Sequence, residues 1–272
     1  MNEVRGIEYI GVGIDKLITL DLKSRGVIYK LYEEACKLLK APLCLTAAQR
    51  ILDTVKSKDN VLITTGFIVP PWQKQETDGP LGAIGLARAL NMTFQATPIL
   101  VTEKECVDIL KEGLHAAGVD AAKVLDFPLK LEDAQNKANK IVREYAPSLV
   151  IAIEKAGRNS KGEYHTMRGL NVTQQHVKIE PLIEEARRHN ILTIGIGDGG
   201  NEVGMGNIKE AIQKFVPYGR VCQCPCGGGI AAESTVDVLV TAAVSNWGGY
   251  GIEASLAYLT KTPEVLHDVE IE

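Results

Sequence analysis

Residues 149–155 read Leu-Val-Ile-Ala-Ile-Glu-Lys, five apolar residues followed at once by two charged ones. A short run without a polar residue predicts a strand buried on both faces, as in a parallel sheet. Similar β-branched runs, each followed by a turn and a segment of helical periodicity, recur along the chain. The other predicted strands are Val61–Thr64, Thr97–Val101, Lys123–Leu125, Ile191–Ile196 and Val236–Val240.

This alternation of strands and helices with short links predicts an α/β fold: a doubly wound, mainly parallel sheet with helices on both faces, which is a Rossmann-like architecture. The first 57 residues differ. Apolar spacing in residues 28–38 and 48–55 predicts two helices there. We expect them to pack on the sheet as an N-terminal helical addition, so that residues 1–272 form one domain.

Composition restricts the class of protein. The 272 residues carry a net charge of −4, whereas nucleic-acid binding requires a basic excess, so we expect no nucleic-acid partner. No apolar run reaches the roughly 18 residues of a membrane span. The N-terminus lacks the pattern of a secretory signal, which favours a reduced cytoplasmic location without disulfides. A homo-oligomer is left open.

Ligands of open parallel sheets bind at the carboxyl ends of the strands, so the candidate site residues are those that follow each strand. Four of them carry charges suited to catalysis: Glu154, Lys155, Arg158 and Asp198. The residues expected to bind substrate are Thr65, Gly66, Glu76, Asp78, Gly79, Gly199, Gly200, Asn201, Glu202, Ser245 and Asn246. The alternative interpretation of Glu154 and Lys155 is a local ion pair or surface charge.

The turn after residue 196 contains a formal G-x-G-x-x-G at Gly195, Gly197 and Gly200. A dinucleotide site also needs an acidic residue about 20 positions on, and the sequence has none there. No phosphate-binding G-x-x-x-x-G-K-[ST] occurs either. Short polar side chains among the glycines instead suit a small anionic or zwitterionic ligand, although an Asx turn at Asp198 is the structural alternative.

Cys222, Cys224 and Cys226 alternate, and an extended chain would place their thiols on one face. Three thiolates on one face would suit a metal. Because no fourth ligand is evident and Pro225 interrupts the run, we expect buried structural thiols and no metal site.

The turns resemble those of the D-glutamate cyclase family, over about residues 8 to 262. The matching strings are 63–67 (Ile-Thr-Thr-Gly-Phe), 76–83 (Glu-Thr-Asp-Gly-Pro-Leu-Gly-Ala), 153–158 (Ile-Glu-Lys-Ala-Gly-Arg), 197–206 (Gly-Asp-Gly-Gly-Asn-Glu-Val-Gly-Met-Gly) and 245–250 (Ser-Asn-Trp-Gly-Gly-Tyr). The resemblance implies a lyase that converts D-glutamate to 5-oxo-D-proline and water. It covers only the C-terminal module of the animal members, which carry a further N-terminal module.

A hypothesis for this reaction assigns Arg158 to the α-carboxylate of the substrate and Lys155 to the reacting carboxyl. Asp198 or Glu154 would be the base, with Asp198 kept ionised by its surroundings. Asn201 and the N–H groups of Gly199 and Gly200 would hold the tetrahedral oxyanion. No cofactor is certain, but a divalent metal on Asp198 and Glu202 could replace Lys155.

Two alternatives are left open for function. The chain could be a non-catalytic module that binds a small ligand or nucleotide, or a different lyase or hydrolase of a small carboxylic acid.

Overall fold

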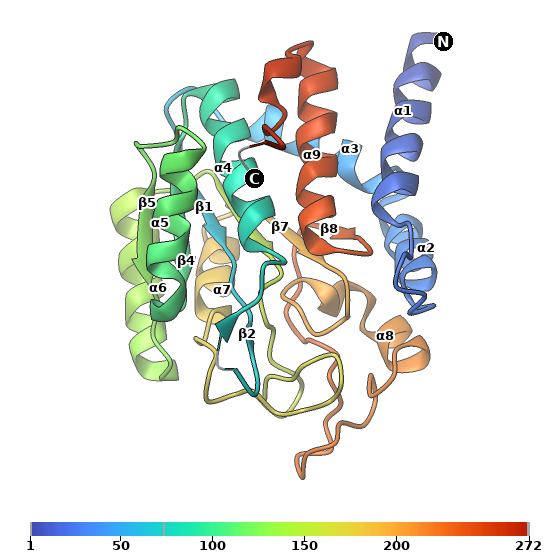
Figure 1. The fold of residues 1–272 in the computed structure, drawn as a ribbon, viewed down its shortest axis with the longest axis vertical. Helices are drawn as coiled ribbons and strands as arrows, with labels where there is room; N and C mark the ends of the chain where they lie inside the picture. The colour runs from blue at the N-terminus through green and yellow to red at the C-terminus, as the bar shows by residue number, and fades with distance from the viewer. Residues whose placement is uncertain (1, 73, 271–272) are drawn as a thin grey trace.

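The structure is a computed structural model and describes residues 2–72 and 74–270. Its centre is a parallel sheet whose six strands lie in the order β5-β4-β1-β6-β7-β8 (Figure 1). These strands are β1 (Asn60–Thr64), β4 (Thr97–Thr102), β5 (Lys123–Asp126), β6 (Leu149–Ile153), β7 (Leu192–Gly197) and β8 (Val238–Thr241). Numbered along the chain, that order is 3-2-1-4-5-6, the arrangement of the doubly wound fold.

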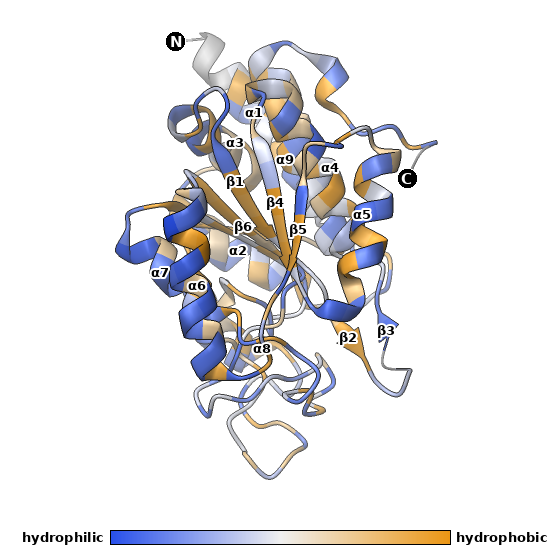
Figure 2. Ribbon diagram, turned by 90° about the vertical axis from the view of Figure 1, so that its left-hand side faces the viewer, coloured by the Kyte–Doolittle hydropathy of each residue, from blue (hydrophilic) through white to orange (hydrophobic). Residues whose placement is uncertain are grey.

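Helices cover both faces of the sheet, which confirms the predicted fold class (Figure 2). The helices are α1 (Asn2–Ile18), α2 (Ile28–Leu39), α3 (Leu43–Thr54), α4 (Pro80–Phe94), α5 (Val107–Ala116), α6 (Leu131–Tyr145), α7 (Glu180–Arg188), α8 (Lys209–Phe215) and α9 (Ser245–Thr260). Helices α4 and α9 pack together on one face, and α6 and α7 pack together on the other. Among the described residues, no helix is both long and apolar enough to cross a membrane.

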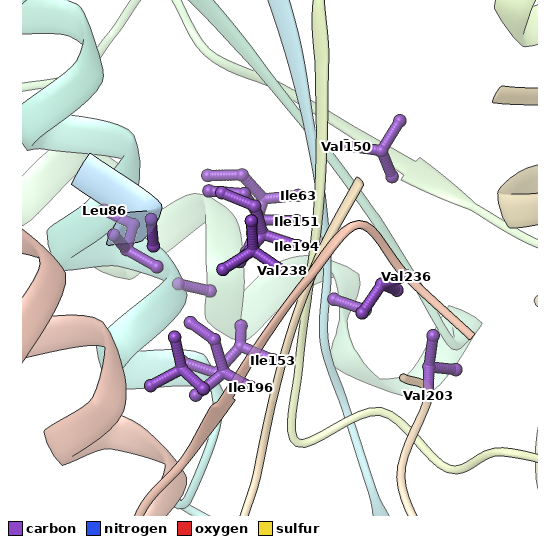
Figure 3. Packing of buried hydrophobic residues seen from close by; sticks show 14 of the residues in the cluster. Ile63, Leu86, Val150, Ile151, Ile153, Ile194, Ile196, Val203, Val236 and Val238 are labelled. Atoms are coloured by element: carbon purple, nitrogen blue, oxygen red, sulfur yellow. The ribbon is translucent and has the colours of Figure 1, made fainter. Parts of the chain in front are cut away.

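The strands form because their apolar side chains fill both layers. Ile63 of β1 lies opposite Ile151 of β6, which in turn lies opposite Ile194 of β7. These three side chains point to the face that Leu86 of α4 covers, whereas Val150 points to the other face (Figure 3). All are buried. Because side chains alternate between the two faces of the sheet, each strand contributes to the hydrophobic cores on both faces.

The six predicted strands all occur, each within two residues of its predicted bounds. The sequence did not predict the small antiparallel hairpin of β2 (Ile68–Val69) and β3 (Lys74–Gln75), which lies in the connection between β1 and α4. The last helix, α9, begins at Ser245. Ser245 and Asn246 therefore sit in its first turn.

The N-terminal segment contains three helices, not the two that were predicted. Three glycines in α1 weaken its helical signal, yet one of them is needed, because a Cβ at Gly11 would lie 2.8 Å from the Cβ of Pro42. The buried carboxylate of Asp15 on α1 accepts the N–H groups of Leu43 and Cys44 at the start of α3. Since the first N–H groups of a helix lack intrahelical acceptors, this cap fixes α1 on α3.

Candidate active site

Three acidic side chains converge where the parallel strands end. Carboxylate oxygens of Asp78, Glu154 and Asp198 all lie within 4.8 Å of one another. Asp78 belongs to the connection between β1 and α4, Glu154 directly follows β6, and Asp198 directly follows β7. Because β1 and β6 are the strands between which the strand order reverses, the convergence lies where doubly wound sheets bind ligands. Glu76 and Glu202 act electrostatically on the same groups, and we call the five residues the acid cluster.

Asp78 is held by the reciprocal capping of two helices. Its carboxylate accepts the backbone N–H groups of Ser245 (3.0 Å) and Asn246 (2.8 Å), at the start of α9. In return, the Oδ1 of Asn246 accepts the N–H groups of Gly79 and Gly82, both at 2.8 Å, at the start of α4. The otherwise unpaired donors of both helix starts are thereby satisfied, and Asp78 is fixed in position.

Glu154 is placed by an unusual backbone. Its φ is +43°, in the left-handed region that costs a non-glycine residue about 1–3 kcal/mol. The side chain is 6% exposed and accepts a hydrogen bond from the hydroxyl of Ser245. Gly79 packs directly against Glu154 and leaves no room for a side chain of its own. A Cβ at Gly79 would lie 2.7 Å from the Cβ of Glu154 and 2.6 Å from the Oγ1 of Thr65. The strained backbone is consistent with a role in function.

The glycine-rich turn after β7 is closed by its own glutamate. Glu202 is buried and accepts the N–H groups of Gly199 (2.8 Å) and Gly200 (2.7 Å). The amide of Asn201 donates to the carbonyl of His165 at 2.9 Å. This corrects the hypothesis that these three residues form an oxyanion hole, because their donors are already used.

Arg25 supplies the counter-charge that the sequence analysis missed. It lies in the loop between α1 and α2, and its guanidinium contacts Asp198 at 2.5 Å and the carbonyl of Ala243 at 2.6 Å. Lys23 of the same loop also acts electrostatically on Asp198. No strand precedes this loop, so the rule that pointed to the other candidates could not find it.

Lys155 points away from the acid cluster. Its ammonium is fully buried and forms an ion pair with both carboxylate oxygens of Glu103, at 2.5 and 2.6 Å. It also donates to the carbonyls of Thr65 and Gly66 at 3.3 Å. The assignment of Lys155 to the reacting carboxyl is therefore corrected. The lysine does form an ion pair, but the pair is buried and its partner is the distant Glu103, so it is neither local nor on the surface.

Arg158 also points elsewhere. Its guanidinium donates to Glu184 of α7 at 2.8 Å, and its backbone N–H donates to Glu180 at 2.6 Å. Its position does not suit the expected role as the anchor of the substrate α-carboxylate. Arg25 and Lys23 are the cations close to the cluster.

The electrostatics of the acid cluster favour bound protons. Burial, reinforced by the neighbouring acids, raises the pKa of Glu76 to about 8 and that of Glu202 to about 7. The same causes raise the pKa of Glu154 well above its ordinary value. Burial also raises the pKa of Asp198, which Arg25 opposes. The ion pair with Arg25 is thus what favours ionised Asp198.

Such a group of carboxyls can both accept and donate protons near neutral pH, or it can surround a cation. Asp78, Glu154 and Asp198 are the members that one divalent ion could reach together, and their oxygens are ligands that Mg²⁺ and Ca²⁺ prefer. We expected Glu202 to share a metal with Asp198, but its carboxylate oxygens accept hydrogen bonds from the backbone N–H groups of Gly199 and Gly200. A substrate ammonium, which donates hydrogen bonds to carboxylates, is another cation that these oxygens suit.

Comparison with known proteins gives a match over almost the whole chain. The sequence profile of the family described as D-glutamate cyclase-like, C-terminal, matches residues 14–272. The human protein named D-glutamate cyclase, mitochondrial, is 31% identical over 259 residues, which is 90% of this chain. The match spans only 38% of that relative's length. The expected cytoplasmic location of this chain stays a prediction.

Similarity to solved structures is weak. A short-chain dehydrogenase/reductase from Mycobacterium ulcerans superposes with a TM-score of 0.34 at 14% identity, covering 59% of this chain and 62% of that one. A UDP-GlcNAc 2-epimerase from Neisseria meningitidis also gives 0.34, at 8% identity, covering 76% and 52%. Superpositions this loose carry no functional argument.

The ion pair of Lys155 with Glu103 generates a first prediction. Lys155→Met should lower the free energy of unfolding by about 3–5 kcal/mol, because it leaves a buried carboxylate without its partner. The double variant Lys155→Met/Glu103→Leu should recover most of that loss, since an apolar pair needs no counter-charge. Urea unfolding of the two variants and the wild type measures this. Wild-type stability in Lys155→Met would contradict a structural role for the lysine.

The raised pKa of Glu76 generates a second prediction. A carboxyl whose pKa is higher in the folded protein binds more protons there than in the unfolded chain, so stability falls as pH rises between the two values. We therefore expect the melting temperature of the ligand-free protein to fall from about pH 5 to about pH 8. In Glu76→Gln, the free energy of unfolding should fall over this pH range by at least roughly 1 kcal/mol less than in the wild type. This corresponds to a difference of about 2–4 °C in the fall of Tm.

The control for this measurement is Glu112→Gln, on the exposed side of α5. It should leave the pH dependence of the melting temperature as in the wild type. If Glu76→Gln and Glu112→Gln give the same curve, Glu76 titrates normally and the electrostatic description of the cluster fails.

Proposed function

The chain belongs to the D-glutamate cyclase-like family, and we propose that it closes the ring of D-glutamate to form 5-oxo-D-proline with release of water. The observation that carries the proposal is the acid cluster, in which several carboxyls with raised pKa values converge beside one arginine. The chain corresponds to 38% of its human relative, so the activity of that whole protein is proposed here for this module.

The reaction is a transfer of protons as much as a ring closure. The α-nitrogen forms a bond to the δ-carbon of the side-chain carboxyl, and one C–O bond of that carboxyl breaks. The nitrogen begins as an ammonium with three protons and ends as a lactam N–H with one. The departing oxygen leaves as water. Two protons therefore pass from nitrogen to oxygen, with no net gain or loss, and a site for this reaction needs groups that accept and return protons.

The acid cluster meets this need. Asp78, Glu154 and Asp198 would surround the substrate ammonium, and Asp198, kept partly ionised by Arg25, would take its proton. Glu76, with a pKa of about 8, would be protonated at neutral pH and would return a proton to the departing oxygen. Good intramolecular geometry of the amine and the carboxyl supplies up to about 7–11 kcal/mol of the barrier.

The N-terminal loop would hold the α-carboxylate, which is bonded to the same carbon as the ammonium. Lys23 lies near the cluster and would attract the α-carboxylate, and the positive charge of Arg25, whose guanidinium is bonded to Asp198 and to the carbonyl of Ala243, would add to this attraction. This replaces Arg158, whose guanidinium binds Glu184. A divalent ion on Asp78, Glu154 and Asp198, if one binds, would polarise a carboxyl oxygen there.

A third prediction tests the proposal directly. The purified chain, incubated with D-glutamate, should yield a product lighter by the mass of one water, measured by mass spectrometry. Asp198→Asn keeps the shape of the side chain but removes its charge, and it should lower the turnover by about 100-fold or more. Asp53→Asn, on the exposed side of α3, is the matched control and should keep wild-type turnover.

Two results would contradict the proposal. Binding of D-glutamate by calorimetry without any loss of water would indicate a binding module. Full turnover in Asp198→Asn would show that Asp198 only stabilises the turn and takes no part in the reaction.

A further inference from the structure

Three cysteines and one histidine meet at the far end of the loops that follow the sheet. One ligand atom each of His165, Cys222, Cys224 and Cys226 lies within 4.8 Å of the other three. The Sγ of Cys222 is 3.5 Å from that of Cys224 and 3.3 Å from that of Cys226. The Nε2 of His165 is 3.2 Å from the Sγ of Cys224 and 3.6 Å from that of Cys226. The four atoms thus form a compact set of donors.

These distances are close to those of a tetrahedral metal site. With Zn–S of about 2.3 Å and Zn–N of about 2.0–2.1 Å, neighbouring ligands of a tetrahedron lie roughly 3.5–3.8 Å apart. None of the three cysteines forms a disulfide. His165 is 1% exposed and Cys222 is 8% exposed, whereas Cys224 and Cys226 are half-buried, so the set is partly shielded from solvent.

We propose that His165, Cys222, Cys224 and Cys226 bind one Zn²⁺ ion in a closed, structural site. Three thiolates and one imidazole form the borderline-soft ligand set that selects zinc over Mg²⁺, Ca²⁺ or Mn²⁺. Four protein ligands leave no open position for a substrate, which is the pattern of a structural and not a catalytic zinc.

The fourth ligand, His165, is far from the cysteines in the sequence, so the sequence alone does not indicate a metal site here. His165 lies in the long loop between β6 and α7, and the cysteines lie in the loop between α8 and β8. Hydrogen bonds bring the two loops together: the backbone N–H of Gln223 donates to the carbonyl of Gly169 at 3.0 Å, and its side-chain amide donates to the carbonyl of Arg168 at 2.7 Å. Only this packing supplies the fourth possible ligand, which is not evident from the sequence.

Such a zinc ion would join two loops that carry no regular secondary structure near the cluster, and it would brace the acid cluster. The carbonyl of His165 accepts the amide of Asn201, the residue beside Glu202. Two residues further on, the sulfur of Met167 accepts a hydrogen bond from Arg25 at 3.2 Å. The ion would therefore hold the loop between β6 and α7 in contact with the turn after β7 and with Arg25, which pairs with Asp198.

Elemental analysis of the wild-type protein, purified without chelator, tests the fourth prediction. It should contain about one zinc per chain. Cys224→Ser and His165→Ala should reduce the zinc content to near zero and lower the melting temperature. Cys36→Ser, which changes a half-buried cysteine on α2, should keep the zinc.

A second measurement covers variants that fail to fold. In the wild type, a mercurial reagent that modifies thiols should release zinc to an indicator dye in proportion to the cysteines modified. The zinc-stripped protein should bind Co²⁺ and show the intense visible absorption of tetrahedral thiolate coordination. These readouts do not depend on turnover of D-glutamate, so they stand or fall separately from the proposed reaction.

Three results would overturn the inference. They are a wild-type protein that holds no zinc and takes up none when zinc is added, iron in place of zinc, and unchanged zinc content in Cys224→Ser.

Discussion

Like charges are buried together at the carboxyl ends of the strands. Carboxylates that leave water and lie beside one another are unstable unless protons or cations offset their charge. Here the raised pKa values of Glu76, Glu154 and Glu202 favour their protonated forms. Arg25 is the cation, and it pairs with Asp198. The same imbalance that makes the arrangement costly makes it able to transfer protons.

The fold holds these groups with contacts that leave little freedom. Asp78 and Asn246 cap each other's helices, and Ser245 bonds Glu154. The N-terminal helices are part of this arrangement, because Asp15 caps α3 and the loop after α1 carries Arg25 to Asp198. The proposed zinc would hold the opposite side of the same site. The cluster is thus fixed from several segments that are remote in the sequence.

The sheet and the position of the site could be predicted from the sequence, because both follow from local patterns. Apolar runs such as Leu149–Ile153 predict buried strands, and Glu154 and Asp198 were found as the residues that follow them. The roles of Lys155 and Glu202 could not be predicted, because they depend on direction and on distant partners. The backbone at Glu154 is left-handed, so the alternation of the strand does not extend to these residues: Glu154 meets Asp198, while Lys155 meets Glu103. Arg25 and His165 follow no strand directly, and only the packing of loops brings them to their partners.

The central claim is that the acid cluster holds protons at neutral pH and passes them to and from D-glutamate. Infrared difference spectroscopy of the protein at neutral pH, with and without D-glutamate, tests it most directly. We expect an absorption of protonated carboxyl groups that is altered by D-glutamate and lost as the pH rises through about 8, and Glu76→Gln should diminish it. A fully ionised set of carboxylates at neutral pH, or a protonated band that D-glutamate leaves unchanged, would contradict the account.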